Sequence, residues 1–226
     1  SCVAQGLALA GVQNLVLVDP DIVSNPNLNR QALYAITDLG KFKVDVAQSR
    51  ISQLNTDADC LVIKEMVKSA EDVTNFSSGA NLVINCADQP ATDQLNRWVT
   101  DACFPIGQSH ILCGGYDGHL SFLGPTVIPG HSACWYCYEK SLDRRLAAYQ
   151  HLQITKSEID GGSLGSISAV TANLHVLEAT KVLSGFAKPS LRNAVAEIDF
   201  HRFQLNLKRF KKQRGCKICN GGKDER

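Results

Sequence analysis

The fold class follows from a short apolar run that ends in an acidic residue, LVLVD at residues 15–19. Consecutive hydrophobic residues are typical of a parallel strand that is buried on both faces. Upstream, apolar residues recur at helical spacing over residues 1–11, and Gly11 ends that segment as glycine often ends a helix. The sequence therefore predicts a helix followed by a buried strand.

Segments with strand and helix periodicity alternate after this point. The expected strands are residues 61–63, 82–86 and 106–112, and the expected helices are residues 41–54, 89–103 and 168–183. Thr37 or Asp38 is expected to cap the first of these helices. Such alternation predicts an α/β fold with a Rossmann-like, doubly wound, mainly parallel sheet.

The later part of the chain changes character. Residues 119–128 form an extended pattern, and residues 194–207 alternate like a pair of strands, so we expect an antiparallel C-terminal extension. Residues 160–165 are rich in glycine and predict a loop. A doubly wound nucleotide fold ordinarily begins with a strand and a glycine-rich turn, so we expect both to lie upstream of Ser1.

Length and composition limit the classes of function. The 226 residues suit one domain, residues 1–226, and 44% hydrophobic with 20% charged residues is ordinary for a soluble globular protein. A net charge of +1 gives no basic field for nucleic acid. No apolar run approaches the roughly 20 residues that span a bilayer, and no signal peptide is present, so we expect a cytoplasmic protein.

The first candidate binding residue is Asp19. An acidic side chain at the carboxyl end of a parallel strand can accept both hydroxyl groups of a ribose. A plain structural turn residue and an NAD-binding residue are equally compatible with this position.

A second group of candidates follows in the segment DIVSNPNLNRQ, residues 21–31, which contains Asn27 and Arg30. Arginine binds phosphate oxygens bidentately. Lys43 begins a helix, where a cation is unfavourable against the helix dipole unless an anion is nearby. The alternatives are a surface ion pair for Arg30 and a solvated helix charge for Lys43.

Asp88 lies in the segment NCADQP, residues 85–90, just beyond an expected strand. This position is on the ligand-binding edge of a parallel sheet, where one carboxylate and several waters can hold Mg²⁺. The alternative is an N-cap of the following helix, and both roles can coexist.

Four of the nine cysteines form two C-x-x-C pairs with the spacing of metal ligands. Four thiolates make a closed tetrahedral Zn²⁺ site, which is structural because it leaves no position for water. The alternative is four unligated or redox-active thiols. The proposed ligands are Cys134, Cys137, Cys216 and Cys219.

Other candidates favour structural roles. Three cysteines in apolar surroundings are expected to be ordinary core residues: Cys86, Cys103 and Cys113. The histidines show no paired ligand spacing, so His110, His119 and His131 are expected to be satisfied core or loop residues. The basic run at residues 208–214 is expected to be a solvated strand end and not a nucleic-acid surface.

Together these motifs resemble the ThiF/MoeB/HesA branch of the ubiquitin-activating-enzyme superfamily. The motifs that carry the resemblance occur in the family's order: Asp19, Asn27-x-x-Arg30-Gln31, Gly40-x-x-Lys43 and Cys-Ala-Asp88. The segment EATKVLSG, residues 178–185, is similar to a helix of that family. The resemblance covers nearly the whole chain, apart from the family's glycine-rich loop.

The resemblance implies an ATP-dependent adenylyltransferase, in which a carboxylate attacks the α-phosphate to give an acyl-adenylate and pyrophosphate. Asp19 would bind the ATP ribose, and Asn27 and Arg30 would contact phosphates. Lys43 would stabilise developing negative charge, and Asp88 would bind Mg²⁺. The family also implies a homodimer whose active-site residues can be shared across the interface, and often a structural zinc site.

Two features favour a peptide substrate. The segments ADQP, GGYDGHLSFLGP and PGHSAC, at residues 87–90, 114–125 and 129–134, resemble the microcin C-type peptide-adenylating enzymes. Those relatives act on small ribosomal peptides and carry an additional N-terminal peptide-gripping domain. No cysteine lies between Cys137 and Cys216, which argues against a thioester or persulfide relay.

Four functions are therefore compared. The first is adenylation of the C-terminal carboxyl of a small ribosomal peptide. The second is activation of a ubiquitin-like sulfur-carrier protein for thiamin or molybdopterin synthesis. A non-catalytic pseudo-enzyme is disfavoured because Arg30, Lys43 and Asp88 are all present. An NAD-dependent oxidoreductase would share Asp19 but gives no reason for Arg30 or the cysteine pairs.

Overall fold

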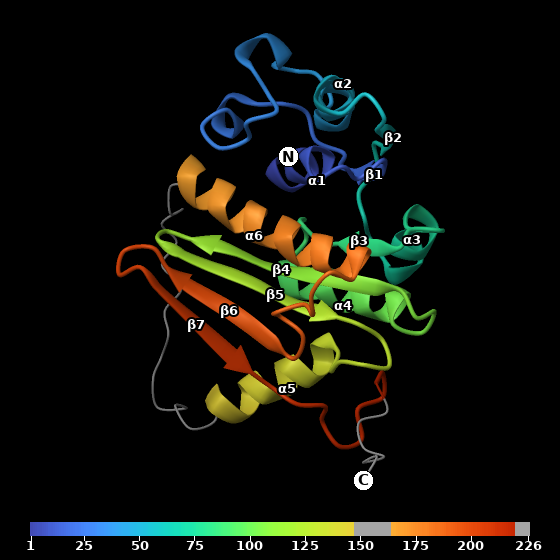
Figure 1. Ribbon diagram of the computed structural model, residues 1–226, viewed down its shortest axis with the longest axis vertical. Helices are drawn as coiled ribbons and strands as arrows, with labels where there is room; N and C mark the ends of the chain where they lie inside the picture. Colours follow the sequence, from blue (N-terminus) through green and yellow to red (C-terminus); the bar gives the residue numbers. More distant parts are fainter. Residues whose placement is uncertain (147–163, 220–226) are drawn as a thin grey trace. The chain divides into compact units, whose positions relative to one another are not determined.

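The computed structural model describes residues 1–146 and 164–219, and the chain forms two compact units (Figure 1). The first unit comprises residues 1–79 and 163–188, and the second comprises residues 80–162 and 189–226. Each unit is described by itself. Most of the expected loop at residues 160–165 lies outside the described residues, but Gly165 begins a helix.

The first unit pairs two parallel strands and surrounds them with helices. Its strands are β1 (Asn14–Val18) and β2 (Asp59–Ile63), and its α-helices are α1 (Cys2–Leu9), α2 (Lys43–Leu54), α3 (Ala70–Phe76) and α6 (Gly165–Ser184). Two short 3-10 helices, η1 (Asn25–Asn27) and η2 (Ile36–Asp38), lie in the connection from β1 to α2. Helix α1 packs against both α2 and α6.

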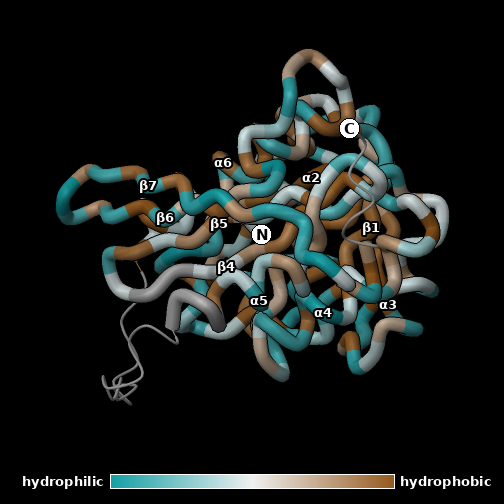
Figure 2. Tube along the Cα trace, turned by 90° about the horizontal axis from the view of Figure 1, so that it is seen from below, coloured by the Kyte–Doolittle hydropathy of each residue, from teal (hydrophilic) through white to brown (hydrophobic). Residues whose placement is uncertain are grey.

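The apolar run that begins the fold forms β1 as expected, and its tube is mostly brown in Figure 2. Leu15 lies opposite Cys60 of β2, and both are buried. The ladder continues past the strand, because the Asp19 N–H donates to the Ile63 carbonyl at 3.1 Å. Parallel pairing with β2 thus fixes the backbone position of Asp19 at the carboxyl end of β1.

The second unit is built on a five-stranded sheet in the order β3-β4-β5-β6-β7. Its elements are β3 (Leu82–Ile84), α4 (Thr92–Cys103), β4 (Ser109–Asp117), β5 (Leu120–Val127), α5 (Trp135–Leu146), β6 (Ala194–Asp199) and β7 (Gln204–Arg209). Strands β3 and β4 are parallel, and the remaining neighbours are antiparallel. The α/β class with an antiparallel C-terminal extension is therefore confirmed.

Helix α4 covers β4, and α5 packs against α4 (Figure 1). The α4 face that points inward carries Leu95, Val99 and Cys103, whose spacing is that of one helical face. Ile111 and Leu112 of β4 are fully buried. Full burial of side chains of this size contributes about 1.5–3 kcal/mol each, so this layer is a main source of stability in the second unit.

The expected side-chain cap of α2 is wrong. The helix begins at Lys43, and its N-cap is Phe42, which makes no side-chain cap bond. Asp38 instead closes its own turn, because its carboxylate accepts from the Ala35 N–H at 3.0 Å and pairs with Lys41 at 2.9 Å. The Lys41 hydrogen bond, followed by the Ala35 N–H, holds the pKa of Asp38 below its usual range.

Two helices, α3 and α5, were not expected from periodicity. Helix α3 is short, but its start carries a recognisable cap: the Ser69 hydroxyl accepts from the Asp72 N–H at 3.1 Å. A serine followed three residues later by an acid is a known helix-start pattern, so this one was detectable.

Among the residues described, no helix combines the length and apolar character needed to cross a membrane.

Helix α6 begins with a close backbone contact that requires glycine. A Cβ at Gly165 would lie 2.5 Å from the Asn29 carbonyl oxygen. We predict that Gly165→Ala destabilises the protein by about 1–3 kcal/mol, because backbone atoms must move to relieve the overlap. Thermal melting tests this, with Ser166→Ala at the next, exposed position as the control. Equal melting temperatures for both variants would contradict this contact.

Candidate functional site

The carboxylate of Asp19 is held at the end of β1 by its own backbone turn. Its Oδ1 atom accepts from the Asp21 N–H at 2.9 Å. Burial raises the pKa of Asp19, and the Asp21 N–H and the charge of Lys43 lower it by less. An acceptor in this position suits a pair of hydroxyl groups, as the sequence predicted.

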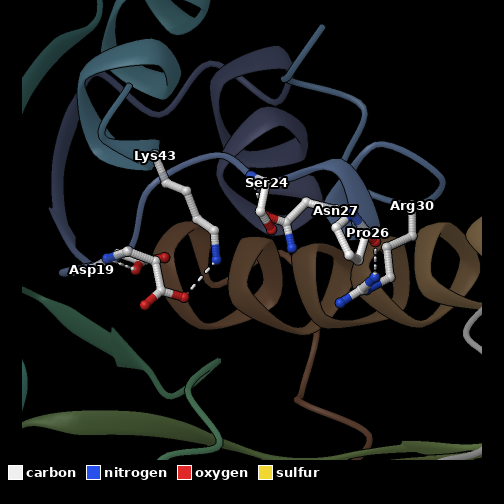
Figure 3. A network of polar contacts seen from close by, with 7 residues as sticks. Asp19, Ser24, Pro26, Asn27, Arg30 and Lys43 are labelled. Carbon is white, nitrogen blue, oxygen red and sulfur yellow. Dashed lines mark hydrogen bonds and ion pairs between the residues drawn. The ribbon is translucent and has the colours of Figure 1, made fainter. Parts of the chain in front are cut away.

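Lys43 is a buried cation at the first residue of α2 and is 8% exposed. Its Nζ atom lies 2.7 Å from Oδ2 of Asp21, and its backbone N–H donates to the Asp21 carbonyl at 2.9 Å (Figure 3). The alternative of a solvated helix charge is therefore wrong. A buried ammonium group requires a counter-charge, and Asp21, whose side chain is 61% exposed, supplies one.

Asn27 and Arg30 lie on the segment between Asp21 and Lys43, and Figure 3 shows their side chains pointing to the same side as that of Lys43. Asn27 is buried, and its Oδ1 accepts from the Ser24 N–H at 3.0 Å and from the Ser24 hydroxyl at 2.9 Å. It therefore builds the turn at η1.

The guanidinium of Arg30 bonds only neutral groups among the described residues. It donates to the Pro26 carbonyl at 2.6 Å and to Asn29 Oδ1 at 3.2 Å. The alternative of a surface ion pair is therefore wrong for the described chain. These two bonds fix the direction of the side chain without neutralising its charge, which leaves it suited to an anion.

Asp88 lies in the second unit, in the loop after β3, where it is exposed. The N-cap of α4 is Ala91, so the alternative of a helix cap is wrong for Asp88. Within the described residues its carboxylate has no hydrogen-bond or ion-pair partner. An exposed carboxylate at the end of a parallel strand retains its full capacity to bind a cation.

The loop that carries Asp88 is anchored by two buried amide side chains that were not predicted. Asn85 donates from Nδ2 to Asn96 Oδ1 at 2.7 Å, and its own Oδ1 accepts from the Ala87 N–H at 3.1 Å. Asn96, on α4, donates in turn to the Cys113 carbonyl at 3.2 Å. The sequence held one signal for this network: Asn96 is a polar residue on the apolar face of the expected helix, and a buried polar group needs a hydrogen-bond partner.

Two further residues near Asp19 were also missed. Asp21 pairs with Lys43 from 22 residues away, and no sequence pattern distinguished it from the acids nearer to that lysine. Burial raises the pKa of Tyr34, and the charge of Asp19 raises it further. No sequence pattern pointed to Tyr34.

The four predicted zinc ligands come together in the second unit. Their sulfur atoms all lie within 4.8 Å of one another, with separations of 3.9 Å for Cys134–Cys137, 3.5 Å for Cys134–Cys216 and 3.3 Å for Cys137–Cys219. Tetrahedral thiolates at Zn–S distances of about 2.3 Å would lie about 3.8 Å apart. The donor set and its spacing therefore fit Zn²⁺.

The surroundings of this cluster also fit a closed site. The Gln213 N–H donates to Cys137 Sγ at 3.2 Å, which orients a ligand sulfur. The cluster packs with Val195 of β6 and with Phe210, whose ring lies 5.3 Å from that of Tyr138. Three of the four cysteines are buried, and four thiolates complete a tetrahedral coordination, so the cluster is suited to a structural role.

The remaining cysteine predictions are mixed. Cys103 is fully buried as expected, and Cys113 is partly buried. Cys86 was expected in the core but is exposed, because β3 ends at Ile84 and the chain has already left the sheet. Among the described residues, only the four clustered cysteines form a candidate metal group, and no histidine joins them.

These features define a class, that of α/β proteins with a candidate nucleotide site and a cysteine cluster that could hold zinc. The nucleotide site is indicated by the acid at the end of a parallel strand, the buried lysine and the arginine. The model of the ThiF family matches residues 1–220. The chain therefore belongs to the ThiF family, and the predicted family is confirmed.

Relatives with named activities agree with this assignment. The sulfur carrier protein ThiS adenylyltransferase of Escherichia coli is 29% identical over 95% of this chain and 79% of its own length. The molybdopterin-synthase adenylyltransferase of Escherichia coli is 26% identical over 96% of this chain and 81% of its own length.

Solved structures show the same fold. E. coli MccB, crystallised with AMPCPP and MccA, superposes with a TM-score of 0.81 at 22% identity, covering 97% of this chain and 64% of MccB. Another structure of MccB names MccB as a microcin C7 biosynthetic enzyme. The chain spans somewhat less than two thirds of the MccB chains that it matches.

We predict that the purified protein contains about one tightly bound zinc ion per chain, because four thiols are already gathered at a spacing that fits tetrahedral Zn²⁺. Elemental analysis under reducing conditions measures this. Cys216→Ser should lower the zinc content and the melting temperature, whereas Cys86→Ala, an exposed cysteine outside the cluster, should retain the zinc. Full-length protein without zinc would contradict the prediction.

Proposed function

We propose that residues 1–226 act as an ATP-dependent adenylation domain that activates the C-terminal carboxyl of a small ribosomal peptide. A carboxylate oxygen of the peptide attacks the α-phosphorus of ATP, the bond from this phosphorus to the bridging oxygen of the β-phosphate breaks, and pyrophosphate leaves. The product is an acyl-adenylate. The observation that carries this proposal is the buried ammonium group of Lys43, paired with the exposed carboxylate of Asp21 next to Asp19.

Three candidate site residues of the first unit have roles that follow from their environments. Asp19 offers a fixed acceptor for the ribose hydroxyls. Arg30, whose charge no described carboxylate neutralises, binds phosphate oxygens. The ammonium group of Lys43, held in place by Asp21, stabilises the negative charge that grows on the phosphate during attack. Such preorganised charges are the main source of rate when the protein forms no covalent bond to its substrate.

Asp88 would supply a carboxylate ligand for Mg²⁺. The exposed carboxylate fits this ion, which takes few protein ligands and keeps its remaining positions for water and substrate phosphates. When bound, the metal supplies charge neutralisation to the triphosphate. The thiolate zinc site takes no part in the reaction and connects the C-terminal segment to the second unit.

Two observations favour a peptide substrate. The fold is that of MccB, including the structure that contains MccA. No cysteine lies between Cys137 and Cys216, so that segment has no thiol to accept the activated acyl group. We also expect a homodimer, as the family resemblance implies, which sedimentation would measure.

The second candidate is activation of a ubiquitin-like sulfur-carrier protein. It is favoured by the two E. coli relatives, which are named for ThiS and for molybdopterin synthase. Both candidates use the same adenylation step and differ in the carboxylate that enters it. The pseudo-enzyme alternative is disfavoured because Lys43 is buried with a counter-charge, an arrangement that a purely structural protein does not require.

We predict that Lys43→Met lowers the rate of substrate-dependent pyrophosphate release by about 10²–10³-fold, because it removes a preorganised charge. Stability should change by less than about 1 kcal/mol, since Asp21 is largely exposed and can be solvated. The matched control is Lys41→Met, which removes an exposed lysine two residues earlier. A normal rate for Lys43→Met would exclude this lysine from the chemistry.

We predict a similar loss for Asp88→Asn, which keeps the shape of the side chain but removes its charge. Because Asp88 caps no helix, the melting temperature should stay unchanged, while the rate falls by about 10²–10³-fold and the dependence on Mg²⁺ concentration weakens. Asp93→Asn, an exposed acid in the first turn of α4, is the control. If both variants keep the wild-type rate, the metal ligand lies elsewhere.

A further inference from the structure

Two cysteines outside the zinc cluster lie at the carboxyl ends of neighbouring parallel strands. In the ladder of β3 and β4, Ile84 lies opposite Ile111, and the Asn85 N–H continues the ladder by donating to the Ile111 carbonyl at 2.9 Å. Continued two residues past the end of β3, this register brings Cys86 level with Cys113 of β4. The two side chains are therefore close to one another at the carboxyl ends of these strands.

A hydrogen bond between the Cys86 and Cys113 side chains agrees with this placement. Cys86 is exposed to solvent, and Cys113 is partly buried behind it. Both backbones are also anchored by the same helix: Asn96 of α4 donates to the Cys113 carbonyl and accepts from Asn85, the residue before Cys86. The pair is therefore accessible from one side and held at a fixed separation.

We propose that Cys86 and Cys113 are a redox modification site at which a reversible disulfide forms and slows adenylation. The oxidant is a low-molecular-weight disulfide, RSSR. The sulfur of Cys86 attacks one sulfur of RSSR and releases one RSH. The sulfur of Cys113 then displaces the second RS group as RSH, and the protein has lost two electrons and two protons to the oxidant.

The backbone is already suited to this bond. Neighbouring strands lie about 4.8 Å apart, and the Cα atoms of a disulfide lie about 4.4–6.8 Å apart. Bond formation would shorten the sulfur–sulfur distance from hydrogen-bond contact to about 2.05 Å. This shift pulls on the segment from Asn85 to Asp88.

The effect on catalysis rests on the proposed function. Asp88 is two residues from Cys86, so a displaced Cys86 moves the carboxylate proposed to bind Mg²⁺. Misplacement of a reacting group by about 1 Å can lower a rate by about 100-fold. The reduced thiols themselves take no part in the adenylation step, so replacing either one with alanine should leave the activity of the reduced protein in place.

The first test is chemical and independent of activity. Zinc-loaded protein is incubated with glutathione disulfide, alkylated and digested without reduction, and the linked peptides are identified by mass spectrometry. We expect a Cys86–Cys113 link that dithiothreitol removes, with the zinc content unchanged. Absence of this link, or linkage of zinc-site cysteines in its place, would overturn the proposal even if the protein adenylates nothing.

The second test measures pyrophosphate release before and after oxidation. The wild type should lose activity about 100-fold and regain it with dithiothreitol, whereas Cys86→Ala and Cys113→Ala should stay active throughout. Cys103→Ala, which removes a buried thiol of the same unit, should keep the wild-type sensitivity. A linked protein with full activity would refute the regulatory effect, and an inactive reduced wild type would count against the proposed function alone.

Discussion

The buried ammonium group of Lys43 is the constraint on which the arrangement of the proposed nucleotide site depends. A charge with so little exposure is stable only beside a counter-charge, and the unit supplies Asp21 at 2.7 Å. Asp21 reaches that position because its N–H binds the carboxylate of Asp19, and Asp19 is placed in turn by the parallel ladder of β1 and β2. The strand that decides the fold thus also positions the polar groups that we assign to the nucleotide.

In the second unit, the loop that carries Asp88 is held by neutral hydrogen bonds between amide groups. Asn96 anchors the end of β3 and the middle of β4 with one side chain, which leaves the carboxylate of Asp88 exposed while its loop is fixed. Far along the sequence, the thiolate cluster joins the start of α5 to the segment after β7. The loop of Asp88 is thus anchored by its own hydrogen bonds, independently of the cysteine cluster that could hold zinc.

The sequence allowed a good prediction of what depends on local pattern. Periodicity located the main strands, and cysteine spacing predicted a cluster that the structure brings together. The errors lay where tertiary contacts decide. Asp38 satisfies its own turn and does not cap α2, and Cys86 is exposed because β3 ends earlier than its apolar run suggested. The partner of Lys43 and the network of Asn96 depend on pairings between distant segments, which no single-sequence pattern encodes.

The central claim is that a free C-terminal carboxylate is the group activated by ATP. The most direct measurement is ATP–pyrophosphate exchange with a synthetic peptide encoded by a short reading frame next to the gene, compared with the same peptide as its C-terminal amide. The account predicts exchange with the free acid and none with the amide. Equal exchange with both peptides, or exchange with neither peptide and with no purified sulfur-carrier protein, would contradict it.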